Sequence, residues 1–240
     1  MSRPLHAFVV PAFEAEDRVA EVVGELRRTQ RDAEIIVVDD GSTDATAQRA
    51  QAASARVVRH PVNRGKGAAL MTGFEAALRR GARMAVTVDA DGQHLAHEAL
   101  RLAEYPAPLD SLVLGVRDLA RDLAPANSQV SNAISNLFLS AFTGHRLEDT
   151  QCGLRRYPLP SALDLGTRDR GYAFEAEVLL RASRAGIPIV QVPVEVYYPP
   201  PGLRQTHFHV IKDPSRIVRR VVKTLLYTRL SPPKLRGGAE

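Results

Sequence analysis

The sequence has little that would indicate a secreted, a disulfide-stabilised or a membrane-spanning protein. Its 240 residues include one cysteine, Cys152, so no disulfide can form within the chain and a cysteine-rich metal site is excluded. A reducing compartment is the simple interpretation. No apolar run approaches the ~20 residues that a spanning helix needs, and the N-terminal residues contain no signal-peptide core. We therefore expect a cytoplasmic protein.

The overall composition is that of an ordinary globular chain. Hydrophobic residues make up 45% and charged residues 25%, which argues against wholesale disorder. The 32 lysines and arginines exceed the 27 acidic residues and give a formal net charge of +5. This charge suggests anionic partners, although it is too small to choose between nucleic acid, a phosphorylated metabolite and anionic lipid.

Strands and helices are expected to alternate along the first half of the chain. Apolar runs predict strands at 5–10, 35–38, 56–59 and 84–88, and helical spacing predicts helices at 16–30, from Ser42 or Thr43 to about residue 53, and at 65–80. The strands are continuous apolar runs, as expected when both faces are covered. The pattern predicts an α/β fold with a mostly parallel sheet and helices on both faces.

The second half is less regular. We expect strands at 111–116, 150–157 and 187–197, and helices at 127–142, 174–185 and 216–229. Pro188 and Pro193 place the last strand at a sheet edge. The predicted organisation is one domain over residues 1–212, followed by a basic amphipathic helix and tail over residues 213–240.

Paired carboxylates follow the predicted strand at 84–88. Asp89 and Asp91 can hold a hard divalent cation through oxygen ligands, and Gln93 adds a third oxygen. Such a cation would neutralise the diphosphate leaving group of a nucleotide sugar. The alternative is a solvated acidic loop that caps the next helix.

Two further loops lie at the same predicted edge, where open α/β sheets bind ligands. Asp39 and Asp40 end the second strand, and a carboxylate there can accept hydrogen bonds from a base or a ribose. The loop also offers caps for the next helix. Lys66 lies in a glycine-rich segment at a helix N-terminus, which favours anions, but the spacing is not that of a Walker motif.

Five ordered motifs resemble those of the family 2 glycosyltransferases of the GT-A fold. They are Val10-Pro11-Ala12-Phe13, Val37-Val38-Asp39-Asp40-Gly41-Ser42, Asn63-Arg64-Gly65-Lys66-Gly67, Asp89-Ala90-Asp91-Gly92-Gln93 and Glu148-Asp149-Thr150-Gln151-Cys152-Gly153-Leu154-Arg155. The fifth is similar to the acceptor-side motif of the polyprenol-phosphate mannosyl- and glucosyltransferase branch. The resemblance spans residues 5–212 and implies a GDP- or UDP-hexose donor, Mg²⁺ or Mn²⁺, and inversion at the anomeric carbon.

The resemblance also implies roles for residues at the matching positions. Asp39 would contact the base, and Asp89 would contact the ribose or the groups around the metal. Asp91 and Gln93 would bind the metal. Arg117 would bind an acceptor phosphate. The nucleotide-sugar site is predicted to comprise Pro11, Phe13, Asp39, Asp40, Lys66, Asp89, Ala90 and Arg204. One departure is that the family continues its first motif as Tyr-Asn-Glu, where this chain has Phe13-Glu14-Ala15.

The expected chemistry follows from charge. Cleavage of the sugar–phosphate bond develops negative charge on the diphosphate, which the metal and Lys66 or Arg204 can stabilise. A hydroxyl acceptor needs a base, for which Asp149 is the candidate. A phosphate acceptor is already anionic, so Asp149 would then orient a basic residue. A purely structural Asp149 would pair with Arg155 or Arg156.

Several features leave alternatives open. His94 and His97 could ligate a metal or lie on a helix surface, and His207 and His209 could close over the diphosphate. The helix at 216–229 could lie on an anionic membrane or pack on the domain. The helix at 127–142, with Val130, Ile134, Leu137, Phe138 and Ala141 on one side, could touch lipid or belong to the core.

The sequence therefore predicts a metal-dependent, inverting hexosyltransferase on the cytoplasmic face of a membrane. Its acceptor is expected to be a polyprenyl phosphate or another envelope lipid, and nucleic acid is not an expected partner. A soluble or hydroxyl acceptor is the alternative. The Asp89-x-Asp91 pattern is also similar to haloacid-dehalogenase-type phosphatases, but these have Thr or Val where Gln93 stands. A non-catalytic nucleotide-binding module is the remaining alternative.

Overall fold

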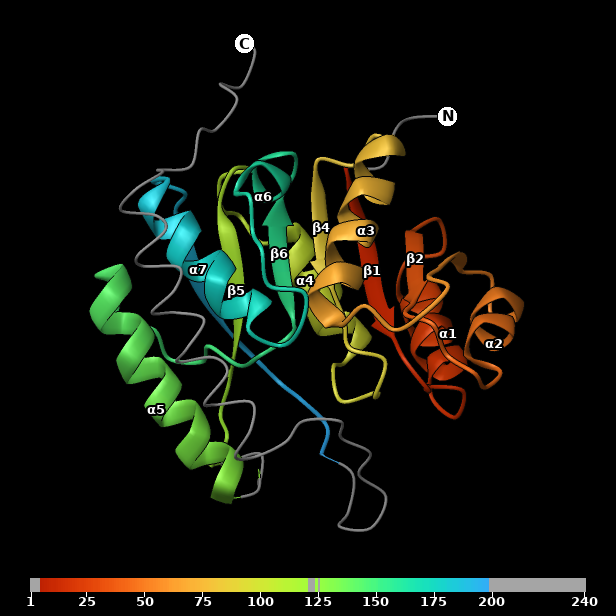
Figure 1. Cartoon of the computed structure of the whole chain (residues 1–240), viewed down its shortest axis with the longest axis horizontal. Coiled ribbons are helices and arrows are strands. Elements are labelled where there is room, and N and C mark those ends of the chain that lie inside the picture. The colour runs from red at the N-terminus through yellow and green to blue at the C-terminus, as the bar shows by residue number, and fades with distance from the viewer. Residues whose placement is uncertain (1–4, 121–123, 125, 199–240) are drawn as a thin grey trace.

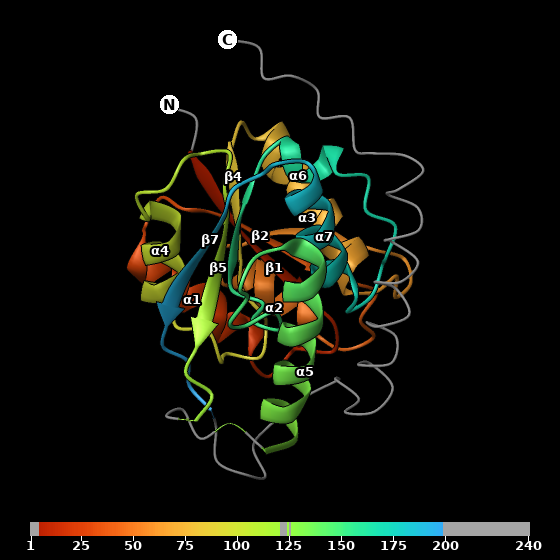
Figure 2. The same ribbon diagram turned by 90° about the vertical axis from the view of Figure 1, so that its left-hand side faces the viewer.

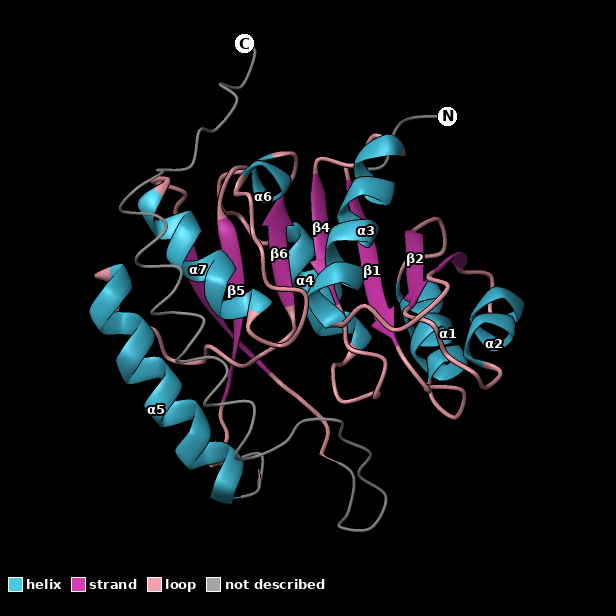
Figure 3. Cartoon of the chain, viewed as in Figure 1, coloured by secondary structure: helices cyan, strands magenta, loops and turns pink. Residues whose placement is uncertain are grey.

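The computed structural model describes residues 5–120, 124 and 126–198, which form one sheet with helices on both faces (Figure 1). Its strands are β1 (His6–Ala12), β2 (Glu34–Asp39), β3 (Arg56–Arg59), β4 (Met84–Thr87), β5 (Leu112–Arg117), β6 (Arg155–Pro158) and β7 (Ile189–Val194). Its helices are α1 (Val19–Thr29), α2 (Thr46–Ala52), α3 (Lys66–Arg79), α4 (Ala96–Glu104), α5 (Ala126–Thr143), α6 (Ser161–Asp164) and α7 (Phe174–Arg184), drawn in cyan in Figure 3.

The seven strands lie in the order β3-β2-β1-β4-β6-β5-β7. All neighbours are parallel except β6, which runs antiparallel to both β4 and β5. The predicted mostly parallel α/β sheet is therefore confirmed. From β1 the chain builds β2 and β3 on one side, and then returns to place β4 on the other side of β1. The strand order therefore reverses at β1, and such a switch point is where open α/β sheets bind ligands.

Two apolar layers cover the sheet, as Figure 2 shows nearly edge-on. Phe8 and Val10 pack into the layer that includes α1 and α4, whereas Ala7 and Val9 pack into the layer that includes α3 and α7. Burial on both faces explains why the strands are continuous apolar runs.

The bounds of strand β6 differ from the predicted ones. The sequence predicted a strand over 150–157, but the strand begins only at Arg155 because residues 149–153 form a loop. Arg155 and Arg156 are fully buried in this central strand. Backbone carbonyls compensate their charge: Arg155 donates to the carbonyls of Cys152 and Thr150, and Arg156 to that of Tyr105.

Other boundaries differ in detail from the expectation. Neither Ser42 nor Thr43 caps α2, since the helix begins at Thr46, whose N–H donates to Asp44 Oδ1 at 2.9 Å. The predicted edge strand with Pro193 is confirmed as β7. In the described part of the chain no helix combines the length and the apolar character needed to cross a membrane. The predicted helix at 216–229 lies outside the described residues.

Candidate active site

The loops after β1, β2 and β4 meet at the carboxyl-end edge of the sheet, and the ends of α3 and α7 contribute side chains. Lys66 on the first turn of α3 lies with its Nζ 2.8 Å from Asp89 Oδ1 and 3.2 Å from Glu175 Oε1. Burial alone would lower the pKa of Lys66, but these two carboxylates raise it above its ordinary value. Lys66 is therefore a permanent cation at the start of a helix, suited to a phosphate.

Asp89 is held in its ionised form by the same contact. Burial alone would raise the pKa of its carboxyl group, but the charge and hydrogen bond of Lys66, together with His94 and Arg117 nearby, outweigh burial and hold this pKa at about 2. Gly153 makes room for the carboxylate, because a Cβ at that position would lie 3.0 Å from Asp89 Oδ1 and closer still to Oδ2. Glu175 and Gly153 were not predicted as site residues, since only the fold brings them to Asp89.

Asp91 has the properties of a carboxylate that suits a divalent cation. Burial and the negative charge of Asp89 raise the pKa of Asp91. Its Oδ1 accepts the N–H of Gln93 at 2.9 Å. A cation would relieve the repulsion between the two carboxylates, and the carboxylate and amide oxygens of Asp91 and Gln93 are hard donors that Mg²⁺ and Mn²⁺ accept. The residues present therefore fit the predicted metal.

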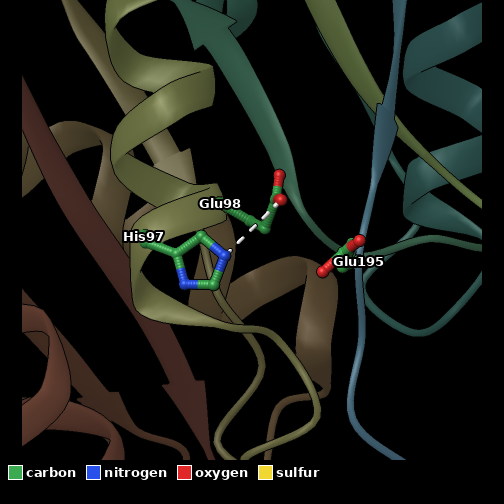
Figure 4. Close-up of side chains that lie close together, drawn as sticks. All are labelled: His97, Glu98 and Glu195. Carbon is green, nitrogen blue, oxygen red and sulfur yellow. Dashed lines mark ion pairs between the residues drawn. The ribbon is translucent and has the colours of Figure 1, made fainter.

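The two histidines considered as ligands lie in different surroundings. His94 is buried, and its Nδ1 accepts the N–H of Asp89 at 3.2 Å, so its proton lies on Nε2. Burial lowers the pKa of His94 and keeps the ring neutral. His97 points away to Glu98 and Glu195 (Figure 4). In the described residues this is the one trio of His, Cys, Asp or Glu with ligand atoms within 4.8 Å of one another, and Arg101 already pairs with Glu98.

Asp39 and Asp40 are buried behind the β2 loop. Asp39 Oδ1 accepts the N–H of Ser42 at 2.9 Å, and its Oδ2 lies 3.1 Å from Arg59 Nε. Arg59 is half exposed and covers Asp39, so contact between Asp39 and a base would require Arg59 to move. This contact stays a prediction.

Asp40 holds the loop that leads into α3. Its two carboxylate oxygens accept the N–H groups of Arg64 at 2.9 Å and Gly65 at 2.7 Å, and Oδ1 lies 2.6 Å from His60 Nδ1. Gly65 has a φ of +95°, which only glycine adopts without strain. These contacts fix the backbone that precedes Lys66 and occupy both oxygens of Asp40. The contact of Asp40 with the nucleotide remains a prediction.

The loop after β1 contains the residues at which this chain departs from the family motif, and the structure shows what Glu14 does there. Glu14 accepts hydrogen bonds from the N–H and the hydroxyl of Thr43, and its own N–H donates to Ser42 Oγ. The shifted carboxylate therefore ties the β1 loop to the β2 loop. Pro11 pairs with Val38 within the sheet and Phe13 follows it, half-buried. The Ala90 side chain lies in the core, so only its backbone is available to a nucleotide.

Asp149 is bound to Arg117, not to Arg155 or Arg156. Its carboxylate is fully buried and accepts Arg117 Nε at 2.7 Å and Arg117 Nη2 at 3.0 Å, together with the backbone N–H groups of Arg117, Gln151 and Cys152. Burial opposes the charge of Arg117, but Asp149 raises the pKa of Arg117 above its ordinary value. The remaining Nη1 lies 3.3 Å from the Tyr198 hydroxyl.

This arrangement positions a cation rather than a base. All five N–H groups converge on the Asp149 carboxylate, which leaves it no exposed oxygen. Cys152 is buried beside it, and burial raises its thiol pKa to about 12, so the thiol is an unreactive part of the core. Arg204, His207 and His209, predicted near the diphosphate, lie outside the described residues.

Comparisons with known proteins agree with the fold and show the family. Residues 7–156 match the model of the family "Glycosyl transferase family 2". The chain is 29% identical over 197 residues to undecaprenyl-phosphate mannosyltransferase of Micrococcus luteus, covering 78% of this chain and 81% of the relative. It is 28% identical over 198 residues to polyprenol monophosphomannose synthase of Mycolicibacterium smegmatis, covering 78% and 75%.

A solved structure with the same fold is glucosyl-3-phosphoglycerate synthase of Mycobacterium tuberculosis, in complex with Mn²⁺, UDP-glucose and phosphoglyceric acid. The TM-score is 0.69 at 22% identity, over 93% of this chain and 79% of that one. The family match covers more than half of this chain and includes all five motifs. The chain belongs to glycosyl transferase family 2 and is a glycosyltransferase.

Proposed function

We propose that this glycosyltransferase moves a hexose from a nucleoside diphosphate sugar to the phosphate group of a polyprenyl phosphate, with inversion at the anomeric carbon and with Mg²⁺ or Mn²⁺ as cofactor. The names of its polyprenyl-phosphate relatives support the acceptor class. The alternative is a soluble phosphorylated acceptor, which is supported by the phosphoglyceric acid bound to the solved structure of similar fold.

The observation that carries the proposal is the pairing of Asp149 with Arg117. A hydroxyl acceptor needs a base to remove its proton, but the Asp149 carboxylate is buried and fully engaged. A phosphate acceptor is an anion that needs positioning more than deprotonation. Arg117, whose Nε and Nη2 are held by Asp149, would present the remaining donors of its guanidinium, including those on Nη1, to a phosphate.

The donor would bind across the loops after β1, β2 and β4. Asp91 and Gln93 would hold the metal, which supplies charge stabilisation for the departing diphosphate. Lys66 adds a fixed positive charge at the N-terminus of α3, and Glu175 with Asp89 holds its ammonium group in place. We propose that the leaving group is stabilised by charge and that the nucleophile is positioned by Arg117.

An acceptor panel tests the proposal. Purified protein is given radiolabelled UDP- and GDP-hexoses with Mn²⁺ and, in parallel, a polyprenyl phosphate, the matching polyprenol and phosphoglycerate. Label should pass to the polyprenyl phosphate and not to the polyprenol, which lacks only the phosphate. Transfer to phosphoglycerate alone would establish the soluble alternative, and transfer to the polyprenol would refute the positioning role of Arg117.

A further inference from the structure

A buried line of hydrogen bonds joins the loop after β2 to helix α3, and it contains a histidine that the proposed function does not use. His60 follows β3 and is 5% exposed. Its Nδ1 lies 2.6 Å from Asp40 Oδ1, and its Nε2 lies 3.0 Å from the hydroxyl of Thr72 on the second turn of α3. The ring therefore connects two elements that meet at the candidate site.

The partners of His60 decide which ring nitrogen carries a proton. The buried Asp40 carboxylate also accepts the backbone N–H groups of Arg64 and Gly65. A carboxylate only accepts, so Nδ1 of His60 carries a hydrogen and donates it to Oδ1 of Asp40. Both ring nitrogens are thus engaged, one by Asp40 and the other by Thr72, and His60 has no nitrogen left for a substrate.

Asp40 closes residues 60–65 into a loop whose two ends meet at its carboxylate. The histidine ring contacts one end of this carboxylate and the N–H of Gly65 contacts the other. The far side of the loop is equally crowded, because a Cβ at Gly65 would collide with the carbonyl oxygen of Arg170. Residues 60–65 are therefore held between the loop after β2 and the segment that precedes α7, which gives the chain one path into α3.

Lys66 is the first residue after this loop, so its position depends on the path of the loop. Its Nζ lies 2.8 Å from Asp89 Oδ1 and 3.2 Å from Glu175 Oε1. The hydrogen bond between His60 and Thr72 adds a second link, because Thr72 lies on the same helix as Lys66. A shift of α3 would break this link. His60 is thus placed to hold the first turn of α3 and, with it, the ammonium group.

We propose that His60 is a positioning residue for Lys66. By joining Asp40 to Thr72, it holds the start of α3 where the Lys66 ammonium group meets the diphosphate of the donor. The inference rests on the proposed function for the contact between Lys66 and the diphosphate, and it does not depend on the acceptor. The rival is a histidine that only packs, which would change the free energy of unfolding without distinguishing between ligands.

The test is calorimetric titration of the full chain at saturating Mn²⁺, so that the metal contributes equally to every variant. GDP is compared with GMP and UDP with UMP, because each pair differs only in the terminal phosphate, from which the sugar departs. His60→Leu removes both hydrogen bonds and leaves an apolar side chain. We expect it to weaken diphosphate binding roughly tenfold, the scale of one hydrogen bond to a charged group, and to leave monophosphate binding close to that of wild type.

Three further variants make the comparison specific. His60→Asn keeps an N–H donor near the position of Nδ1 and should recover most of the diphosphate affinity. Thr72→Val keeps the shape of its side chain but loses the hydroxyl, so it should weaken diphosphate binding in the same sense and by less. The control is His6→Leu, which removes a 2.9 Å contact with Gln30 at the start of β1, the opposite end of that strand from the site. It should bind both ligands as wild type does.

The possible results separate the inference from its rival. Equal losses of diphosphate and monophosphate affinity in His60→Leu, or no loss of either, would overturn the inference. So would a His60→Asn variant that binds the diphosphate no better than His60→Leu. If His60→Leu does not fold, wild-type diphosphate affinity in Thr72→Val would overturn it in the same way.

The inference and the proposed function can fail separately. Sugar transfer to phosphoglycerate alone would refute the proposed acceptor and leave the role of His60 in place. A wild-type protein that binds the diphosphate no more tightly than the monophosphate would refute the role proposed for Lys66, and this inference with it. Transfer to a prenyl phosphate with unchanged ligand preference in His60→Leu would refute the positioning role of His60 alone.

Discussion

Replacing Asp149 by asparagine separates a positioning carboxylate from a catalytic base. The substitution keeps the size of the side chain and removes its charge. One of the two oxygens becomes an NH₂ group that cannot accept from Arg117 or from the backbone N–H groups of Gln151 and Cys152. Arg117, only 14% exposed at its side chain, loses the partner that compensates its charge.

The loss of stability in Asp149→Asn can be bounded from the burial of the Asp149–Arg117 pair. Removing one partner of a buried ion pair destabilises a protein by about 3–5 kcal/mol. Since the Arg117 side chain retains some contact with water, we expect about 3 kcal/mol or less off the free energy of unfolding, measured by urea denaturation. The protein should stay folded at room temperature, so kinetic measurements are feasible.

The kinetic expectation is a rise in KM for the phosphate acceptor with little change in donor affinity, because the guanidinium loses its fixed orientation. The measurement is initial-rate transfer at varied acceptor, with wild type, Asp149→Asn, Arg117→Met and the double variant. If Asp149 acts through Arg117, the double variant should lose no more activity than Arg117→Met alone.

A base would behave differently in the same assay. Loss of a general base typically lowers the rate by roughly 10²–10⁴-fold. The rate losses caused by the two substitutions would then multiply in the double variant. The acid limb of the pH profile would also disappear in Asp149→Asn. That pattern, with acceptor KM unchanged, would refute the positioning role and favour a hydroxyl acceptor.

Three other predictions concern the donor side and stability. Asp91→Ala should abolish the Mn²⁺-dependent gain in nucleoside diphosphate affinity, measured by calorimetric titration, with thermal unfolding unchanged; a preserved metal effect would refute the metal assignment. Gly153→Ala should weaken donor binding, because the added Cβ displaces the Asp89 carboxylate, and wild-type affinity in this variant would show that the carboxylate position is not critical. Burial raises the pKa values of Cys152 and Tyr157 to about 12, so the unfolded chain loses these protons first and stability should fall above pH 9 by about 1.4 kcal/mol per pH unit for each ionising group. Cys152→Ala should remove the part of this slope that begins near pH 9, and an unchanged slope in urea denaturation would contradict the burial argument.

The parts of the fold that could be predicted are those in which burial imposes a simple pattern. Strands β1, β2 and β4 are covered on both faces and are therefore apolar throughout, and the acidic loops after them mark the ligand edge. Strand β6 was predicted with its start five residues too early, because its buried arginines are compensated by backbone carbonyls and no pattern of side chains records that. The helix α6 was not predicted, and the helix expected after Gln93, which is α4, was given no bounds.

The site was predictable where function depends on residues next to one another in the chain, as in Asp89, Asp91 and Gln93. It was not predictable where the partner is distant. A structural Asp149 was expected to pair with Arg155 or Arg156. The fold instead places Arg117, at the end of β5, against its carboxylate. The apolar positions of α5 were recognised as one face, and only the structure shows that this face is exposed.

The most direct test of the account is to identify the atom that receives the sugar. Wild-type protein is incubated with the nucleotide sugar, Mn²⁺ and a short-chain prenyl phosphate, and the product is examined by ³¹P nuclear magnetic resonance and by the proton coupling at the anomeric carbon. The account predicts that the phosphate monoester becomes a diester and that the anomeric configuration is inverted relative to the donor. A prenyl phosphate that remains a monoester while sugar is transferred to a hydroxyl group would contradict it.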